Sequence, residues 1–406
     1  MKKKNPNTFD RLIVLMLASL SLGMVGGSLQ PIRIFIIICV PLMLMYSVRN
    51  KKFRQLHKYE SYFFMLWWIY ATMSLLWAIE VDESIKHIFY FAVNFLGFFV
   101  ILWLADRANE PQQSVVNGWI LAFILTIPIA FYELWFDVHL SLSKQESDNL
   151  MNFGGMILQR RFASVTFYNL NGYNTFLCYI LPFIASTFFI AQKSFKMAIN
   201  WILLLLLCYL IISNSSRGAV FCLVVGLSVF MFYYLKKGKL IFISLVLIFI
   251  VTRYTALLYF EEIFEIISVR LKISGLEDVG RYENITMGLK AVVDSNLFGI
   301  GVGNYIPYME RLGLGISIPH NLFIEIVAQY GVFIFIGFLF ILFRIIQSIR
   351  KNQSIFNKVI ISIGLFTYPF VNIINSGYLL TASTWLYLAS LCIIANKYYN
   401  KESIYG

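Results

Sequence analysis

The hydrophobic residues of this chain fall into long continuous runs that are separated by short polar segments. A helix crosses the hydrocarbon core of a membrane, about 30 Å thick, with about 20 apolar residues. Roughly twelve such runs can be marked, near 11–29, 31–48, 61–79, 86–105, 116–136, 166–191, 197–213, 218–235, 240–258, 321–346, 356–374 and 379–396. The pattern predicts an all-α polytopic membrane protein with about twelve transmembrane helices, in a single membrane domain over residues 1–406.

Composition supports this prediction. Hydrophobic residues make up 59% of the 406 residues and charged residues only 13%, with a mean hydropathy of +0.73. A soluble domain of this length cannot bury that much apolar surface. All five cysteines lie inside apolar runs without a CxxC or Cys/His spacing, so we expect neither a disulfide framework nor a metal site. The basic start and apolar run at the N-terminus resemble a secretory signal, but a second run follows at once, which favours a retained first helix.

The Lys and Arg residues predict how the chain is oriented. They account for a net charge of +12, and about two thirds of them fall in alternate connections, at 49–58, 192–196, 236–239, 344–358 and the tail from Lys397. Basic residues are retained on the cytoplasmic side of a membrane. We therefore expect both termini in the cytoplasm, and we do not expect a nucleic-acid partner.

One external connection, 259–320, is too long for an idle loop between the ninth and tenth helices. We expect it to form a periplasmic loop subdomain. Its first part, 259–273, has apolar residues at helical spacing, which indicates an amphipathic helix. That helix either lies on the outer membrane surface or covers the mouth of the bundle, and the pattern does not separate the two.

Three basic residues share the predicted external face: Arg217 in "SNSSRGAV", Arg281 in "VGRYENI" and His320 in "PHNLFIE". Taken singly, they also fit an interfacial arginine, a solvated loop charge and an ordinary interfacial histidine. Together they suggest an anion site, because a guanidinium beside the first N–H groups of a helix suits phosphate. We expect Pro319 to lie near the first turn of the tenth helix. The partial positive charge there would keep His320 neutral and able to accept a proton.

Other segments are weaker candidates. "RRFASVTFYNLNGYNTF" (160–176) places Arg161 and Asn171 at a helix entrance, where they would bind sugar hydroxyls or simply cap the helix. Glu80 and Asp82 in an external loop either bind a metal or form a solvated acidic turn. "FGIGVGNY" (298–305) lacks the GxGxxG spacing of a nucleotide loop and is interpreted as a flexible, tightly turning segment.

Three segments in order, "SSRGA", "GRYENITMGLKAVVDSNLFGIGVGNY" and "PHNLFIEIVAQYGVFIFIGFLF", resemble the O-antigen ligase and polymerase superfamily of bacterial surface-polysaccharide assembly. The resemblance covers roughly 160–345. It implies a membrane glycosyltransferase of the GT-C type in the bacterial cell (inner) membrane. Such an enzyme moves a glycan from undecaprenyl diphosphate to an acceptor sugar on the periplasmic side. It also implies that Arg217, Arg281 and His320 are the essential residues, with His320 as the base of an inverting reaction that needs no metal or other cofactor.

Several functions remain open. A polymerase joins lipid-linked repeat units and a ligase moves the finished chain to the lipid A core, and we lean slightly towards the polymerase. A capsule or teichuronic-type polymerase of a Gram-positive cell is a further possibility. The expected partners are the lipid-linked donor, the acceptor glycan, the bilayer and a chain-length regulator, with Arg161, Asn171 and Asn321 in substrate binding. Two rival hypotheses are a lipid-linked oligosaccharide flippase, which would carry its charges near the midplane of the membrane, and a metal-dependent transferase that uses Glu80 and Asp82.

Overall fold

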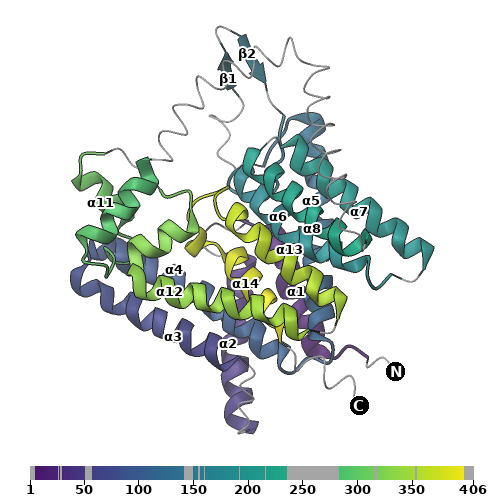
Figure 1. Ribbon diagram of the computed structural model, residues 1–406, viewed down its shortest axis with the longest axis horizontal. Helices are drawn as coiled ribbons and strands as arrows, with labels where there is room; N and C mark the ends of the chain where they lie inside the picture. The colour runs from purple at the N-terminus through teal and green to yellow at the C-terminus, as the bar shows by residue number, and fades with distance from the viewer. Residues whose placement is uncertain are drawn as a thin grey trace.

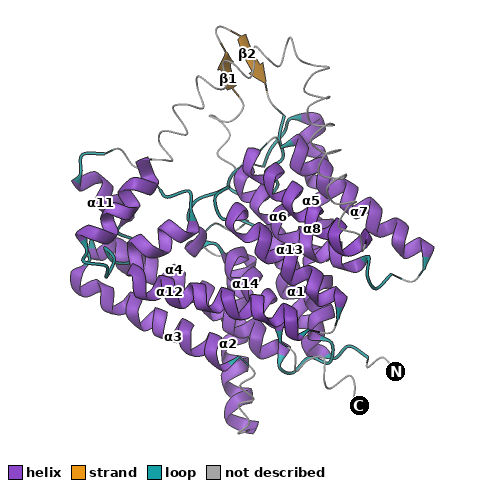
Figure 2. Ribbon diagram, viewed as in Figure 1, coloured by secondary structure: helices purple, strands orange, loops and turns teal. Residues whose placement is uncertain are grey.

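Helices make up nearly all of the described structure (Figure 2). The computed structural model describes residues 5–25, 27, 30–50, 57–140, 150–153, 156–159, 161–191, 193–214, 216–235, 283–314, 318–352 and 354–396. The labelled helices are α1 (Thr8–Ala18), α2 (Pro31–Asn50), α3 (Lys58–Met73), α4 (Val81–Ala105), α5 (Pro111–Phe136), α6 (Leu170–Thr187), α7 (Ser194–Ser213), α8 (Arg217–Leu235), α11 (Tyr305–Arg311), α12 (Leu322–Lys351), α13 (Ile355–Val371) and α14 (Ala382–Ala395). The structure also contains three short 3-10 helices. Two of them, η1 (Ser19–Leu22) and η2 (Ser74–Trp77), follow α1 and α3 directly, and η3 (Tyr378–Leu380) lies between α13 and α14.

Eleven of the twelve predicted runs coincide with these helices, whereas the run at 240–258 lies outside the described residues. So does the predicted amphipathic helix at 259–273. Among the described helices, five are long and apolar enough to cross a membrane, namely α4, α5, α7, α8 and α12. The figure of twelve transmembrane helices therefore stays a prediction.

The structure departs from the all-α prediction in one place. Strands β1 (Leu150–Phe153) and β2 (Met156–Gln159) pair as an antiparallel hairpin within the predicted external loop near 137–162. Figure 1 shows this hairpin well away from the helices. Hydropathy had marked the segment only as a polar connection, because four-residue strands are too short to give a periodic signal.

Helix α14 lies at the centre of the bundle. Thirteen of its residues, Ala382–Ile394, are buried, as expected for a helix that is apolar on every side. On one flank Trp385 packs edge-on against Phe91, at 5.2 Å between ring centroids. On the other flank Tyr387 stacks on Tyr179 at 4.2 Å. Helix α14 thus joins α4 on one side to α6 on the other.

The outer surface of the bundle is strongly apolar. On α7 alone, large hydrophobic side chains stand exposed at Trp201, Ile202, Leu205, Tyr209 and Ile212. Water-soluble monomers rarely expose continuous apolar surface of this kind. The exposed side chains therefore face lipid, which agrees with the sequence-based class of membrane protein.

The two ends of the bundle differ in charge. At one end α1 begins and α14 ends (Figure 1), and Gln112 Nε2 at the start of α5 donates to Ile394 O at 3.2 Å. We call this the basic end, and it carries Arg11, Arg107, Arg350, Lys351 and Lys358. Buried Asp10 holds it together by accepting hydrogen bonds from Asn109 N, Glu110 N and Ser114 Oγ. Helices α6, α8 and α12 start at the opposite end, which we call the site end.

Helix α12 is broken at Gly331, where φ is 77° and ψ is 178°. The segment 298–304, which we call the glycine turn, packs into the break: Ile300 N donates to Ala328 O at 2.9 Å, and Gly301 N donates to Gln329 O at 3.1 Å. A methyl group at Gly331 would collide with the carbonyl of Leu297. The predicted helix at 321–346 is therefore two helical pieces, and the first carries the residues that follow His320.

Candidate functional site

Three helices of the site end start against the segment 372–378, which joins α13 to η3 and includes the first residue of η3. We call it the α13–η3 turn. Its first residue, Asn372, is fully buried, and Tyr179 of α6 donates to Asn372 Oδ1 at 3.0 Å. Its last residue, Tyr378, donates from its hydroxyl to Val371 O at 2.9 Å, which closes the turn on itself. Helices α6, α8 and α12 all start against this turn.

The start of α12 is held by both ends of the turn. Leu322 N donates to Asn372 O at 3.0 Å, and buried Glu325 accepts a hydrogen bond from Tyr378 N at 3.1 Å. Asn321 caps the helix, since its Oδ1 accepts from Phe323 N at 2.9 Å. His320 therefore lies one residue before the cap. Pro319 lies three residues before Leu322, the first residue of α12, and so near the first turn of the helix as the sequence predicted.

The start of α8 approaches the same turn from another side. Arg217 is the first residue of α8, as the sequence indicated, and its side chain is exposed. A methyl group on Gly218 would lie 3.1 Å from Ile374 Cγ1, so the glycine allows this close approach. The backbone next to Arg217 is consequently fixed against the turn that also fixes the residues after His320.

The start of α6 completes the arrangement. Asn169 caps this helix, with Gly172 N donating to its Oδ1 at 2.7 Å. A methyl group on Gly172 would lie 3.6 Å from Asn375 Nδ2 of the turn. Asn171, the residue before Gly172, is partly exposed. Of the two interpretations of this segment, capping accounts for Asn169, and sugar binding stays a prediction for Asn171.

The structure describes three further predicted site residues, Arg161, Glu80 and Asp82. Arg161 is exposed at the site end, where its Nη1 donates to Trp135 O at 3.1 Å. Glu80 and Asp82 lie at the start of α4, and Glu80 N donates to Asn304 Oδ1 of the glycine turn at 2.7 Å. Arg281 lies outside the described residues.

Comparison with known proteins gives a family for this region. A model that describes the O-antigen ligase family matches residues 202–374. Residues 202–374 are similar to the O-antigen ligase family. The matched segment contains Arg217, Arg281 and His320 and ends within the α13–η3 turn, and it confirms the resemblance that the three sequence segments carried.

One curated relative extends the comparison. The chain is 24% identical over 311 residues to the teichuronic acid biosynthesis protein TuaE of Bacillus subtilis (strain 168). The alignment covers 72% of this chain and 62% of TuaE, so the chain spans less than two thirds of that relative. The match extends well beyond the O-antigen ligase segment and into further helices of the membrane domain.

The structure adds a buried carboxylate, outside the segment matched by the O-antigen ligase model, that sequence reasoning missed. Glu133, near the end of α5, is 1% exposed, and its Oε2 accepts hydrogen bonds from Ser164 N at 2.7 Å and Val165 N at 2.8 Å. His139 Nδ1 lies 3.6 Å from the same oxygen. The signal was a lone carboxylate near the end of a long apolar run, which is costly in a membrane protein unless it has partners.

Asn214 holds the same segment from the opposite side. Its Oδ1 accepts from Ala163 N at 2.8 Å, and its Nδ2 donates to Asn174 Oδ1 at 3.0 Å. Because Asn214 precedes Arg217 by three residues, it connects the entrance segment 161–169 to the start of α8. Glu133 and Asn214 together fix the backbone between Arg161 and Asn171.

A second missed residue is Arg33, at the start of α2. Only 9% of it is exposed, and its guanidinium lies 4.8 Å from the centre of the Tyr90 ring. It lines a pocket of about 320 Å³ that also contains Gln30 and Leu380. The pocket adjoins η3, so it adds a cation beside the α13–η3 turn.

Replacing Glu133 by alanine is expected to lower the free energy of unfolding by about 2–6 kcal/mol. The reason is that two buried N–H groups, of Ser164 and Val165, lose their acceptor at a cost of about 1–3 kcal/mol each. Thermal unfolding of the purified protein in detergent measures the change. Glu83→Ala, which removes an exposed carboxylate paired with Lys86, is the control and should change stability by less than about 0.5 kcal/mol. Equal midpoints for both variants would contradict the assignment.

Proposed function

We propose that this chain is a membrane glycosyltransferase that transfers a glycan from undecaprenyl diphosphate to an acceptor sugar during surface-polysaccharide assembly. The observation that carries the proposal is the convergence of α6, α8 and α12 on the α13–η3 turn. It brings the starts of three helices, with Asn171, Arg217 and His320, to one end of an apolar bundle. The similarity of residues 202–374 to the O-antigen ligase family supports the same reaction class.

In this proposal the arginines bind the diphosphate of the donor. Cleavage of the bond between the anomeric carbon and the phosphate oxygen leaves a lipid diphosphate, whose negative charge has to be stabilised as it develops. Arg217 offers a planar, permanently charged donor at the first turn of α8, where backbone N–H groups also point outward. Arg281 is the second proposed cation.

His320 is the proposed general base. It takes the proton of the acceptor hydroxyl as that oxygen bonds to the anomeric carbon, and the diphosphate leaves from the opposite face with the bonding electron pair. The product has the inverted configuration. Arg161, Asn171 and Asn321 are proposed to bind the sugars, with the qualification that Asn321 Oδ1 also caps α12.

We favour a polymerase over a ligase that uses the lipid A core. The relative TuaE is named for the biosynthesis of teichuronic acid, and teichuronic acid is not a lipopolysaccharide. A flippase is less well supported, because Arg217, the proposed cation that the structure describes, lies at the start of α8 and not midway along the helix.

A surface-glycan gel from a deletion strain tests the proposal. Loss of a polymerase leaves single repeat units on the surface or on the lipid carrier, whereas loss of a ligase leaves full-length polymer on the lipid carrier. We expect single units, and a plasmid copy of the chain should restore the polymer. Full-length surface polymer in the deletion strain would overturn the proposal.

The orientation of the chain is proposed to put the site end outside and the basic end in the cytoplasm. The support is the set of basic residues that includes Arg11, Arg107 and Arg350. In a background without the five native cysteines, we expect Val293→Cys to react with an impermeant thiol reagent on intact cells. Arg350→Cys should react only after the cells are opened. The reverse labelling pattern would show that the orientation is wrong.

A further inference from the structure

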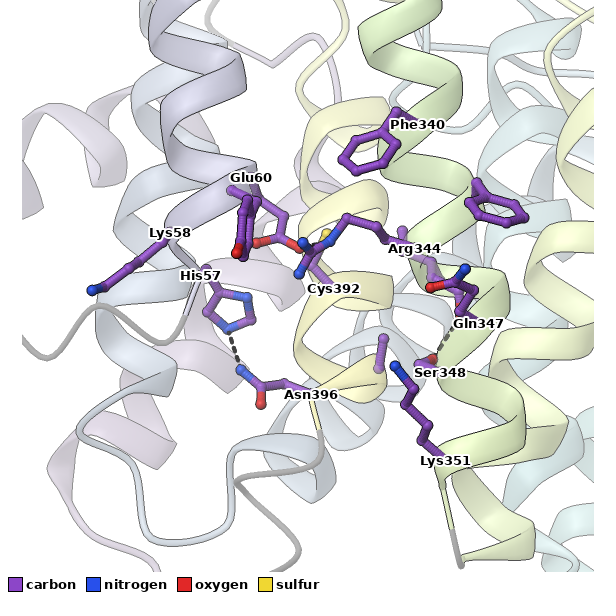
Figure 3. Close-up of a pocket in the computed structure, with 14 residues that line it drawn as sticks. His57, Lys58, Glu60, Phe340, Arg344, Gln347, Ser348, Lys351, Cys392 and Asn396 are labelled. Carbon is purple, nitrogen blue, oxygen red and sulfur yellow. Dashed lines mark hydrogen bonds and ion pairs between the residues drawn. The ribbon is translucent and has the colours of Figure 1, made fainter.

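A pocket of about 600 Å³ lies at the basic end, far along α12 from His320, between α3, α12 and the end of α14 (Figure 3). None of the described residues assigned to glycan transfer lines it. Its walls come from elements that are distant in sequence, as shown by lining residues His57, Arg344 and Asn396. The proposed reaction therefore leaves this pocket unexplained.

One face of α12 supplies most of the wall. Besides Ile345, its lining residues are Phe340, Phe343, Arg344, Gln347, Ser348 and Lys351, and these six are spaced by three or four residues along one side of the helix. The two phenylalanines are each 51% exposed. The wall thus changes along α12 from apolar at Phe340 and Phe343 to polar and cationic between Arg344 and Lys351.

The charged groups of the pocket are predominantly positive. Arg344 reaches across from α12 towards α3, where its Nε lies 3.5 Å from Glu60 Oε1 and its guanidinium lies 4.1 Å from the Tyr59 ring centre. Lys351 stands exposed at the polar end of the pocket. Lys58 also belongs to the lining, although its side chain points away from the centre in Figure 3. Glu60 is the one carboxylate among the lining residues.

His57 adds a neutral polar group. It is only 5% exposed, and Asn396 Nδ2 donates to its Nε2 at 3.3 Å. Burial, with the nearby Arg344 guanidinium, lowers the pKa of the His57 ring to about 4, so the ring is uncharged at neutral pH. The positive charge inside the pocket therefore comes from Lys351 and Arg344.

We propose that this pocket binds an anionic glycerophospholipid, with the phosphate near Arg344 and Lys351 and an acyl chain along Phe340 and Phe343. The order of chemistry along α12 matches that of a lipid, whose apolar chain joins a charged headgroup at the membrane surface. Basic pockets between helices at the cytoplasmic side of membrane proteins bind such headgroups. A bound lipid would link α3, α12 and α14 at the end opposite the proposed catalytic site.

The test compares lipids on the full-length protein in detergent. Binding of a lipid to the folded state raises the unfolding midpoint as its concentration rises, and the dependence gives an affinity. Phosphatidylglycerol should raise the midpoint, whereas phosphatidylcholine and inorganic phosphate at equal ionic strength should not. Lys351→Gln should weaken phosphatidylglycerol binding about fivefold, since one basic residue near a lipid surface contributes about 1 kcal/mol. Arg350→Gln removes the neighbouring exposed charge, which does not line the pocket, and should leave the affinity unchanged.

Three outcomes would overturn the proposal. A shift with phosphatidylcholine equal to that with phosphatidylglycerol would show a site for acyl chains without headgroup selection. The same shift with inorganic phosphate would show a simple anion site. Equal weakening of binding by Lys351→Gln and Arg350→Gln would show a general effect of surface charge. None of these results depends on glycan transfer, so the outcome is independent of the proposed function.

Discussion

Replacing Arg217 by alanine is expected to reduce glycan polymerisation by about 100- to 1,000-fold while the protein remains in the membrane. Arg217 begins α8 at the α13–η3 turn, with an exposed side chain, so its loss creates no cavity. Removal of one group that stabilises developing negative charge costs about 3–4 kcal/mol of transition-state free energy in other enzymes. The measurement is the rate of polymer formation from lipid-linked repeat units by membranes with equal amounts of protein.

Two controls make the Arg217 result specific. Arg217→Lys keeps the charge but loses the planar two-pronged donor, so it should recover only part of the rate. Arg311→Ala removes another exposed arginine of the site end, whose Nη2 lies 3.4 Å from Ile79 O, away from the turn. It should keep nearly the full rate. Equal losses for Arg217→Ala and Arg311→Ala would indicate a general effect of charge at this end.

Replacing His320 by alanine is expected to reduce the rate by about 100- to 10,000-fold, the usual contribution of a positioned general base. His320 lies one residue before the cap of α12, and the cap itself is made by Asn321. The substitution therefore leaves the helix start intact, and the unfolding midpoint should hardly change. The rate of polymer formation, followed from about pH 6 to 9, is the measurement.

The pH profile distinguishes a base from a structural histidine. A variant that has lost only the base should be slow at every pH, and the rise in rate that the wild type shows as its histidine loses a proton should disappear. His320→Gln keeps a polar side chain of similar length and should be as slow as alanine. A His320→Gln variant with the wild-type rate would rule out proton transfer by His320.

Hydropathy alone predicted most of the helical framework. Each apolar run within the described residues became a helix, because a chain in lipid has to satisfy its backbone hydrogen bonds within each helix. The sequence also predicted that a helix begins at Arg217, where a polar turn meets an apolar run. These features depend on local composition, which a single sequence displays directly.

The features that the sequence did not predict depend on contacts between distant segments. The break at Gly331 exists because the glycine turn donates hydrogen bonds to carbonyls of α12. An isolated glycine in an apolar run does not indicate that a distant segment will pack against it. Glu133 was missed for a related reason. Its partners, Ser164 and Val165, lie more than thirty residues away.

The candidate site could be predicted only in part. Motifs gave Arg217 and His320, and the structure places the backbone beside each of them on one turn, through Ile374 and Asn372. The sequence did not predict the role of this turn, because "NIINSGY" has the pattern of an ordinary connection between two helices. What makes it central is the set of helix starts that pack against it, and packing of this kind is not visible in a linear pattern.

The most direct test of the central claim, that Arg217 and His320 serve one donor at the site end, measures donor binding and single-turnover transfer separately in purified protein. We expect Arg217→Ala to weaken binding of the lipid diphosphate donor and to slow transfer. We expect His320→Ala to bind the donor as tightly as the wild type and to transfer no glycan. If both variants bind and transfer like the wild type, the account of this site is wrong.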